Sequence, residues 1–225
     1  MNDDVAERLV SANQLVNKFI IRNEIVINDY YWELFANEIS NLHKIKWLGF
    51  ELGEVSKEFH AGALGVNKKK NRIFYNSTMN KGRINFTICH ELSHFIWDSN
   101  YGKNVSYFGS SLLMPYSDDE IEIEKITDSA AGVLMLPDIL IVKFLESNMS
   151  FPKFSEKLGM SQAALYVRLV QFLEHRLGMR NKFARSNINN LRYHGKRDAI
   201  NRALVGAYST TNVKNEIIYA YENCV

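Results

Sequence analysis

One stretch in the middle of the chain, residues 88–97, constrains both fold and chemistry more than any other. It reads Ile-Cys-His-Glu-Leu-Ser-His-Phe-Ile-Trp and contains the pattern His-Glu-x-x-His. Four residues advance an α-helix by slightly more than one turn, so His90 and His94 lie on one face. Two imidazoles placed in this way can bind one Zn²⁺, and Glu91 can reach a water molecule on that ion. The stretch therefore predicts a helix that carries a metal site.

Apolar residues repeat at helical spacing around this pattern, which favours the helical interpretation. The repeat consists of Ile84, Ile88, Leu92, Phe95 and Ile96, and it predicts a buried stripe opposite the histidines. The helix is expected to begin near Lys81 and to end before the turn-like sequence at Asn100. The competing interpretation is a surface face with two histidines and a glutamate. The helical context favours the metal site, which is typical of zinc peptidases.

A tetrahedral catalytic site needs a third protein ligand and leaves the fourth position to water. In the acidic segment 120–137, Glu124 and Asp128 are four residues apart and share a helical face. We interpret Glu124 as the third ligand and Asp128 as the carboxylate that accepts the free ring N–H of a ligand histidine. Glu120 is the fallback ligand, although acids in the first turns of a helix are favoured by the helix dipole. A solvated surface acid is the alternative for Glu124.

Three segments of the chain, residues 73–76, 83–94 and 124–137, match the pattern of a known family. Members carry a strand ending in Ile-x-x-Asn, then Arg-x-x-Phe-Thr-x-x-His-Glu-x-x-His, then Glu-x-x-Ala-Asn-x-Phe-Ala-Ala-x-Leu-Leu-Met-Pro. In these segments the chain resembles the ImmA/IrrE family of bacterial and phage metallopeptidases. The resemblance covers about residues 45–175.

Apart from Asp128, the departures from the family pattern fall at positions where packing is expected. Asp128 stands where the family usually has Asn, and its spacing from Glu124 is also that of the thermolysin-like gluzincins. The other departures are Thr127 and Gly132 in place of Ala, Ala130 in place of Phe, and Ser93 where Gly is common. We expect these replacements to affect helix contacts more than chemistry.

The motif and the resemblance together lead to one mechanistic hypothesis, a zinc-dependent endopeptidase. His90, His94 and Glu124 would hold the ion and Glu91 would act as the general base. Two histidines and one carboxylate would also accept Mn²⁺ or another divalent ion. The resemblance implies a narrow substrate, namely a helix-turn-helix transcriptional repressor that is cut to derepress a mobile element or a stress regulon. The residue that stabilises the oxyanion is not identified by the sequence.

Composition limits the class of protein further. At 225 residues and 46% hydrophobic residues, the chain can bury a substantial core. No apolar run reaches eighteen residues, so no membrane span is expected, and the first residues lack a signal-peptide core. The two cysteines, Cys89 and Cys224, fit a reducing cytoplasm, where we expect the protein to act. Cys89 is interpreted as a buried core residue because it projects about 100° away from His90 on a helix.

Periodicity along the chain predicts an α+β fold in which a small mixed or antiparallel sheet packs on a zincin-like active-site helix. Helices are predicted over 5–22 and over 29–42, the second capped by Asp29. Strands are predicted over 44–52, 61–66 and 72–76, the last two as a hairpin through a basic turn. Residues 61–65 are a candidate edge strand to which an extended substrate could add.

The second half of the chain is predicted to be mostly helical. Residues 154–169 have the spacing of a helix-turn-helix, but the second helix is largely apolar, so a structural pair is favoured over a DNA-binding one. Residues 176–205 are basic and Asn-rich; they could dock an acidic partner or nucleic acid, although a solvated tail is the commoner explanation. Residues 216–221 resemble a strand. The connector 103–117 is apolar and could form a wall of the cleft or only fill core.

We predict four parts: N-terminal helices over 1–43, a zincin-like metallopeptidase core over 44–150, a helical pair over 151–178 and a basic C-terminal extension over 179–225. Two other functions compete with the peptidase. One is a DNA-binding regulator that uses 154–173 and the basic tail, with a structural or degenerate metal site; its DNA binding would survive Glu91→Gln. The other is a toxin, or its partner, in a two-gene module, which a neighbouring gene would reveal.

Overall fold

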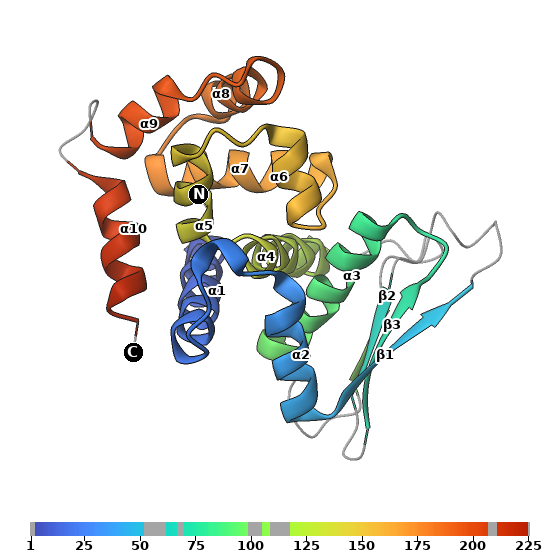
Figure 1. Cartoon of the computed structure of the whole chain (residues 1–225). Helices are drawn as coiled ribbons and strands as arrows, with labels where there is room; N and C mark the ends of the chain where they lie inside the picture. The colour runs from blue at the N-terminus through green and yellow to red at the C-terminus, as the bar shows by residue number, and fades with distance from the viewer. Residues whose placement is uncertain are drawn as a thin grey trace. The chain divides into compact units, whose positions relative to one another are not determined.

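The chain divides into two compact units. The structure, a computed structural model, describes residues 3–51, 62–66, 70–98, 105–108, 118–206 and 211–224 (Figure 1). One of these, the central unit, is Tyr31–Ala131; the other, the flanking unit, combines Met1–Tyr30 with Gly132–Val225. The fold is α+β, as predicted. The four-part division into domains stays a prediction.

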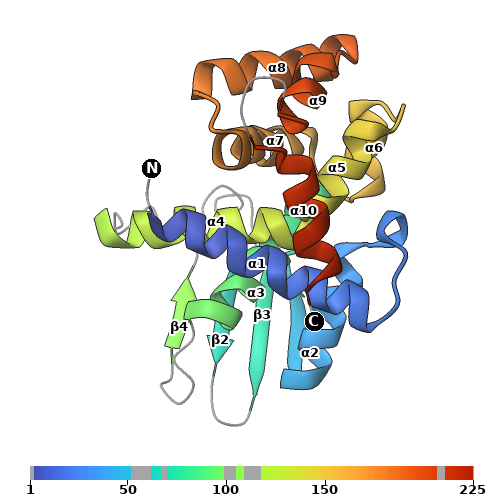
Figure 2. The same ribbon diagram turned by 90° about the vertical axis from the view of Figure 1, so that its left-hand side faces the viewer.

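The central unit contains a four-stranded mixed sheet with the order β1-β3-β2-β4 (Figure 2). Its strands are β1 (Ile45–Phe50), β2 (Gly62–Val66), β3 (Asn71–Asn76) and β4 (Val105–Phe108). β1 runs parallel to β3, whereas β2 is antiparallel to both β3 and β4. The predicted mixed sheet and the β2–β3 hairpin are therefore confirmed.

The prediction that residues 61–65 form an edge strand is wrong for the part that the structure describes. β2 is paired on both sides, since Ala63 lies opposite Phe74 of β3 and opposite Phe108 of β4. Among the described strands, β4 is the outer one on this side of the sheet. β4 has only four residues inside an apolar connector, too short a segment for periodicity to reveal. Residue 61 and the rest of the connector lie outside the described residues.

Helix α3 (Lys81–Ser93) carries the His-Glu-x-x-His pattern across one face of the sheet (Figure 2). It begins where predicted, because the side chain of Asn80 accepts a hydrogen bond of 3.0 Å from the amide of Arg83. Of the predicted apolar stripe, Ile88, Leu92 and Phe95 are buried, whereas Ile84 and Ile96 are only half-buried. Cys89 is also buried, which raises the pKa of its thiol, and it is a core residue as predicted. The helix continues as a π-helical turn, η3 (His94–Asp98).

Helix α2 (Trp32–His43) packs on β1 through aromatic side chains. Trp32 stacks on Trp47 with ring centroids 6.0 Å apart, and the indole N–H of Trp47 donates to Ser40 at 2.9 Å. The predicted cap at Asp29 is wrong, because Asp29 ends a short 3₁₀ turn, η1 (Ile27–Asp29). Tyr31 occupies the N-cap position without a side-chain hydrogen bond.

Helices are the regular secondary structure in the described residues of the flanking unit. Its helices are α1 (Asp3–Arg22), α5 (Asp138–Glu146), α6 (Phe151–Lys157), α7 (Gln162–Leu177), α8 (Asn181–His194), α9 (Asp198–Leu204) and α10 (Val213–Glu222). Helix α4 (Asp118–Met135) begins in the central unit and ends in the flanking unit. None of the helices in the described ranges is long and apolar enough to cross a membrane.

Two expectations for the C-terminal region are overturned. The strand predicted over 216–221 is helical: α10 is capped by Asn212 and buries Val213 and Ile217, four residues apart. Packing at helical spacing thus overrides the strand propensity of its Ile and Tyr residues. The basic segment 176–205, for which a solvated tail was the commoner explanation, forms the end of α7 and helices α8 and α9.

The predicted helical pair is confirmed as a local structure. α6 ends at a turn in which Gly159 has φ +62°, a left-handed conformation that glycine adopts without strain. Ser161 then caps α7, accepting a hydrogen bond of 3.0 Å from the amide of Ala164. Helix-turn-helix spacing therefore corresponds to two real helices.

A buried ion pair joins α7 to α5. Arg168 is only 2% exposed; its Nε donates to the carbonyl of Leu136 at 3.0 Å, and its Nη2 bonds the Asp138 carboxylate. Arg176 approaches the other oxygen of Asp138 at 2.8 Å. A Cβ at Gly132 would lie 3.2 Å from Arg168 Cδ, so glycine gives the buried arginine its space. The substitution of Gly for the family's Ala thus accompanies a buried charge.

Arg168→Met should destabilise the protein by about 3 kcal/mol, because it leaves the Asp138 carboxylate buried with one partner fewer. Thermal or urea unfolding measures the loss. Arg176→Met is the matched control: its side chain is 33% exposed, so it should cost less than about 1 kcal/mol. Equal losses in the two variants would contradict the assignment of Arg168 as the principal buried partner.

Candidate metal centre

Three ligand-type side chains converge between α3, η3 and α4. The Nε2 atoms of His90 and His94 are 3.1 Å apart. The Glu124 carboxylate places one oxygen 3.1 Å from His90 Nε2 and the other 3.3 Å from His94 Nε2. With one ligand atom taken from each residue, the three atoms lie within 4.8 Å of one another. The structure therefore brings together the three residues that the sequence selected, whereas Glu120, the fallback, is exposed and outside the group.

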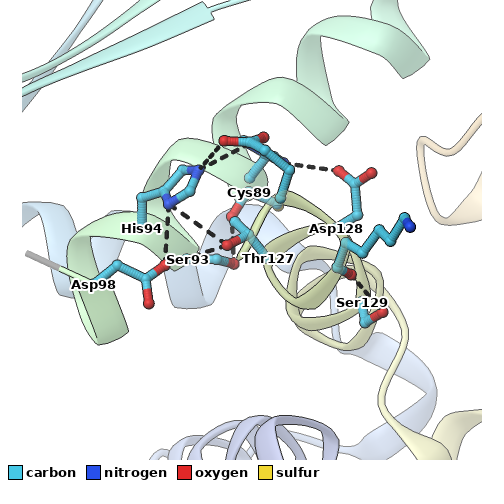
Figure 3. A network of polar contacts seen from close by, with 10 residues as sticks. Cys89, Ser93, His94, Asp98, Thr127, Asp128 and Ser129 are labelled. Carbon is cyan, nitrogen blue, oxygen red and sulfur yellow. Dashed lines mark hydrogen bonds and ion pairs between the residues drawn. The ribbon is translucent and has the colours of Figure 1, made fainter. Parts of the chain in front are cut away.

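Each histidine is held from behind by a carboxylate. His90 Nδ1 lies 2.8 Å from Asp128 Oδ1, which is the contact predicted for Asp128. His94 Nδ1 lies 3.0 Å from Asp98 Oδ2, a partner that the sequence analysis missed. The hydroxyl of Thr127 donates to the same oxygen of Asp98 at 3.2 Å, as Figure 3 shows beside His94. Both imidazoles consequently have a fixed orientation.

The role of Asp98 could have been predicted from its spacing in the sequence, and that of Thr127 from its hydroxyl group. Asp98 follows His94 by four residues, which is the spacing that places two side chains on one helical face. The predicted apolar stripe includes Phe95 and Ile96, and no role is predicted for Asp98. Thr127 was expected to affect helix contacts, but its hydroxyl bonds the carboxylate that holds His94. A carboxylate partner was sought for one histidine, although each ligand histidine usually has one.

The hydrogen bonds at Nδ1 determine which atoms face the centre of the group. A carboxylate accepts, so Nδ1 of each histidine carries the proton and Nε2 of the neutral ring is an acceptor. Two such nitrogens and a carboxylate then face one another with no donor between them. This arrangement is unfavourable unless protons or a cation supply positive charge. The group is consequently suited to bind a cation.

The pKa values of the three side chains reflect the same need for positive charge. Burial alone would lower the pKa of His90, but hydrogen bonds to Asp128 and Glu124 raise it to about 10. For His94, burial opposes and hydrogen bonds to Asp98 and Glu124 outweigh it, so its pKa is raised. For Glu124, burial opposes and the two histidines lower its pKa to about 2. The carboxylate thus stays charged at neutral pH, and His90 holds a proton that a cation must displace.

The spacing of the donor atoms fits a small tetrahedral cation. Ligand bonds of about 2.0–2.1 Å in a tetrahedral shell place neighbouring ligand atoms about 3.3 Å apart. The three separations of 3.1, 3.1 and 3.3 Å are close to this value. Three protein ligands leave a fourth position, which is the composition of a catalytic rather than a structural site.

Glu91 lies next to the ligands but has a different environment. Its residue is 2% exposed, and burial raises the pKa of its carboxyl to about 7 although both histidine charges lower it. Its Oε2 is buried and has no hydrogen-bond partner among the residues that the structure describes. A buried carboxyl without a partner is costly and is available to exchange a proton with a reactant.

Strand β2 approaches Glu91 closely at a glycine. A Cβ on Gly62 would lie 3.0 Å from Glu91 Oε1, 2.9 Å from the Phe74 carbonyl and 2.4 Å from a methyl carbon of Thr87. Two of these neighbours cannot move easily, since one is backbone and the other belongs to a buried threonine. Glycine at this position therefore allows the sheet and the Glu91 carboxylate to lie in contact.

The site combines two histidines on one helix, a glutamate from a second helix and a buried acid, and it lies beside a mixed sheet. Such a site is that of a metallopeptidase. A family model described as Peptidase_M78, IrrE N-terminal-like domain, matches residues 53–170, more than half of the chain. The chain belongs to this family, and the resemblance to ImmA/IrrE metallopeptidases is confirmed. A comparison with curated proteins found no match.

Removing either carboxylate behind a histidine should weaken metal binding. Asp98→Asn and Asp128→Asn are each expected to lower affinity for the ion by about 10–100-fold, because the ligand tautomer is no longer fixed. Competition with a chelating dye measures the affinity. Glu122→Gln is the control, since Glu122 is an exposed acid on the same helix as Asp128. An effect of Glu122→Gln as large as that of Asp98→Asn would contradict these roles.

Metal affinity should rise with pH across the neutral range. The pKa of His90, raised to about 10, means that its imidazole is protonated at pH 7, and the pKa of His94 is raised as well. A protonated imidazole cannot bind a metal. Each proton displaced makes binding about tenfold tighter per pH unit until the pKa of the histidine is reached. Calorimetry in buffers of different ionisation enthalpy counts the released protons. Binding at pH 7 without proton release would contradict this account.

Proposed function

We propose that the protein is a zinc-dependent endopeptidase of the gluzincin type. The observation that carries this proposal is the convergence of His90, His94 and Glu124 at separations that fit a tetrahedral ion with one open position. Zn²⁺ suits two nitrogens and one oxygen in this geometry, whereas Mn²⁺, the competing ion, prefers an octahedral shell richer in oxygen. Glu124 and Asp128, four residues apart, have the gluzincin spacing.

The protein's residues have separate tasks in peptide hydrolysis. When bound, the ion supplies Lewis-acid chemistry by acidifying water and polarising the substrate carbonyl. Glu91 takes a proton from the attacking water and delivers it to the leaving amine. A carboxyl whose pKa is raised to about 7 by burial can accept a proton and release it again near neutral pH. Asp98 and Asp128 keep the histidine lone pairs directed at the ion.

The proposed substrate is an extended segment within one specific protein. An extended segment can add as a strand to β4, the outer described strand on this side of the sheet. Membership of the IrrE-like family supports a helix-turn-helix transcriptional repressor as the protein that is cut. A repressor substrate, together with two free buried cysteines, supports action in the cytoplasm.

Cleavage of purified repressors tests this proposal. The zinc-loaded protein is incubated with a panel of helix-turn-helix repressors and, separately, with an unfolded protein such as casein. Mass spectrometry then identifies the new termini. One defined cut in a repressor supports the proposal, whereas cleavage of casein with every repressor intact contradicts the substrate assignment.

Glu91→Gln is the matched inactive variant because it keeps the size of the side chain and removes the base. It should retain the bound ion while turnover falls by about 10²–10⁴-fold. Metal analysis and the rate of repressor cleavage are measured on the same preparation. A variant that cleaves at the wild-type rate would show that Glu91 is not the general base.

Gly62→Ala should lower turnover without loss of the ion, because the added methyl group would lie 3.0 Å from Glu91 Oε1, and the three atoms nearest to it include none from the three proposed ligands. We expect a loss of at least tenfold in kcat/KM, or about 1.4 kcal/mol of transition-state stabilisation. Gly65→Ala is the control on the same strand, where the nearest atom to the new Cβ is a Phe74 ring carbon at 3.3 Å. If the two variants lose activity equally, proximity to Glu91 is not the cause.

A further inference from the structure

A second helix pair with helix-turn-helix spacing follows the predicted one. α7 ends at Gly178, which has φ +61°, and α8 begins at Asn181 after a turn of residues 178–180. A three-residue turn that contains glycine is typical of helix-turn-helix motifs. Sequence spacing alone predicts the motif at α6 and α7, where DNA binding is disfavoured because α7 is largely apolar. In the pair α7–α8, α8 takes the position of the second helix.

α8 has one apolar face and one polar face. Its buried residues are Ala184, Ile188 and Leu191, and the helix packs on α7 and α6, which Figure 1 and Figure 2 both show beside it. At 100° per residue, the opposite face consists of Lys182, Ser186, Asn189, Asn190 and Tyr193. All five of these residues are exposed, Tyr193 by 66%. We call these five residues the outer face of α8.

The charged side chains of α8 and of the turns that flank it are all basic. Residues 180–197 contain no Asp or Glu. Arg180, Lys182, Arg185 and Lys196 are exposed and lie near the two ends of α8. The Glu174 carboxylate, on α7, accepts from the Asn181 amide at 2.7 Å, and Asn181 in turn accepts from Arg185 at 2.9 Å. The region thus presents exposed cations around an outer face of mostly uncharged polar side chains.

The outer face is held by contacts beneath it. The Arg192 guanidinium lies 5.7 Å from the Phe151 ring of α6 and 5.2 Å from the Tyr193 ring. It also bonds the Gln162 side chain of α7 at 3.4 Å. Arg192 is therefore engaged in joining the three helices, and we do not count it among the cations available to a ligand.

We propose that α8 binds double-stranded DNA with its outer face in the major groove. Asn side chains pair with adenine edges there, while Lys and Arg contact phosphates on either side. A helix is also the element that fits the major groove. An acidic protein would use the cations but would not require the amide side chains between them. This surface lies beyond the residues 53–170 that define the peptidase family and adds a DNA-binding activity to the proposed protease.

Fluorescence anisotropy with a labelled 24-base-pair duplex of randomised sequence tests the proposal on the full chain. We expect micromolar binding at low salt that weakens steeply as salt rises. Lys182→Glu/Arg185→Glu should weaken binding at least tenfold and reduce the slope of log K against log salt by about two. The control, Lys153→Glu/Lys157→Glu, makes the same charge change at exposed positions on α6 and should bind like wild type.

Two nearly isosteric variants separate a loss of DNA binding from a loss of folding. Asn189→Asp places one negative charge on the outer face and should weaken duplex binding several-fold, whereas Gln14→Glu, an exposed position on α1, should not. A duplex that fails to bind at 100 µM protein overturns the proposal. Tighter binding of a single strand, binding of a poly-glutamate peptide but not of the duplex, or equal losses in the α6 and α8 variants would overturn it as well.

Discussion

The hydrogen bond that each ligand histidine makes through Nδ1 determines what the site can do. Asp128 behind His90 and Asp98 behind His94 leave both Nε2 atoms as acceptors facing the Glu124 carboxylate. Three acceptors at this distance repel one another unless a positive charge lies among them. The same geometry thus explains the raised pKa values of the histidines, the lowered pKa of Glu124 and the suitability of the group for a cation. Glu91 is buried, and its Oε2 has no hydrogen-bond partner among the described residues, so this neighbouring acid is available to exchange protons.

Two departures from the family pattern have polar consequences that packing considerations alone would not reveal. Thr127, where the family has Ala, donates a hydrogen bond to Asp98 and so helps to hold His94. Gly132, also in place of Ala, leaves room for the side chain of Arg168, which pairs with Asp138 in the flanking unit. In both cases a small change on α4 accompanies a charged partner on another segment. Thr127 and Asp98 are 29 residues apart in the sequence, and Gly132 and Arg168 are 36 apart, so the pattern of α4 by itself could not reveal either pair.

The sequence was sufficient to predict those parts of the fold that depend on interactions between residues close together in the chain, such as helix caps and apolar stripes. α3 was placed correctly because Asn80 caps it and an apolar stripe runs along it, and three site residues follow from its four-residue spacing. Glu124 was found because a catalytic ion needs a third ligand. The position of β2 inside the sheet was not predictable, since it depends on pairing with the short strand β4. α10 was mistaken for a strand because its isoleucines and tyrosines have high strand propensity, and only tertiary contacts of Val213 and Ile217 favour the helix.

Metal content is the most direct test of the central claim, that three side chains hold one catalytic ion. Elemental analysis would compare the wild-type protein with Glu124→Ala, and with Glu122→Gln as an exposed control on the same helix. The account predicts about one zinc per chain in the wild type and the control, and a loss of stoichiometric zinc in Glu124→Ala. Full retention of zinc in Glu124→Ala, or a wild-type protein that takes up no zinc when it is supplied, would contradict the account.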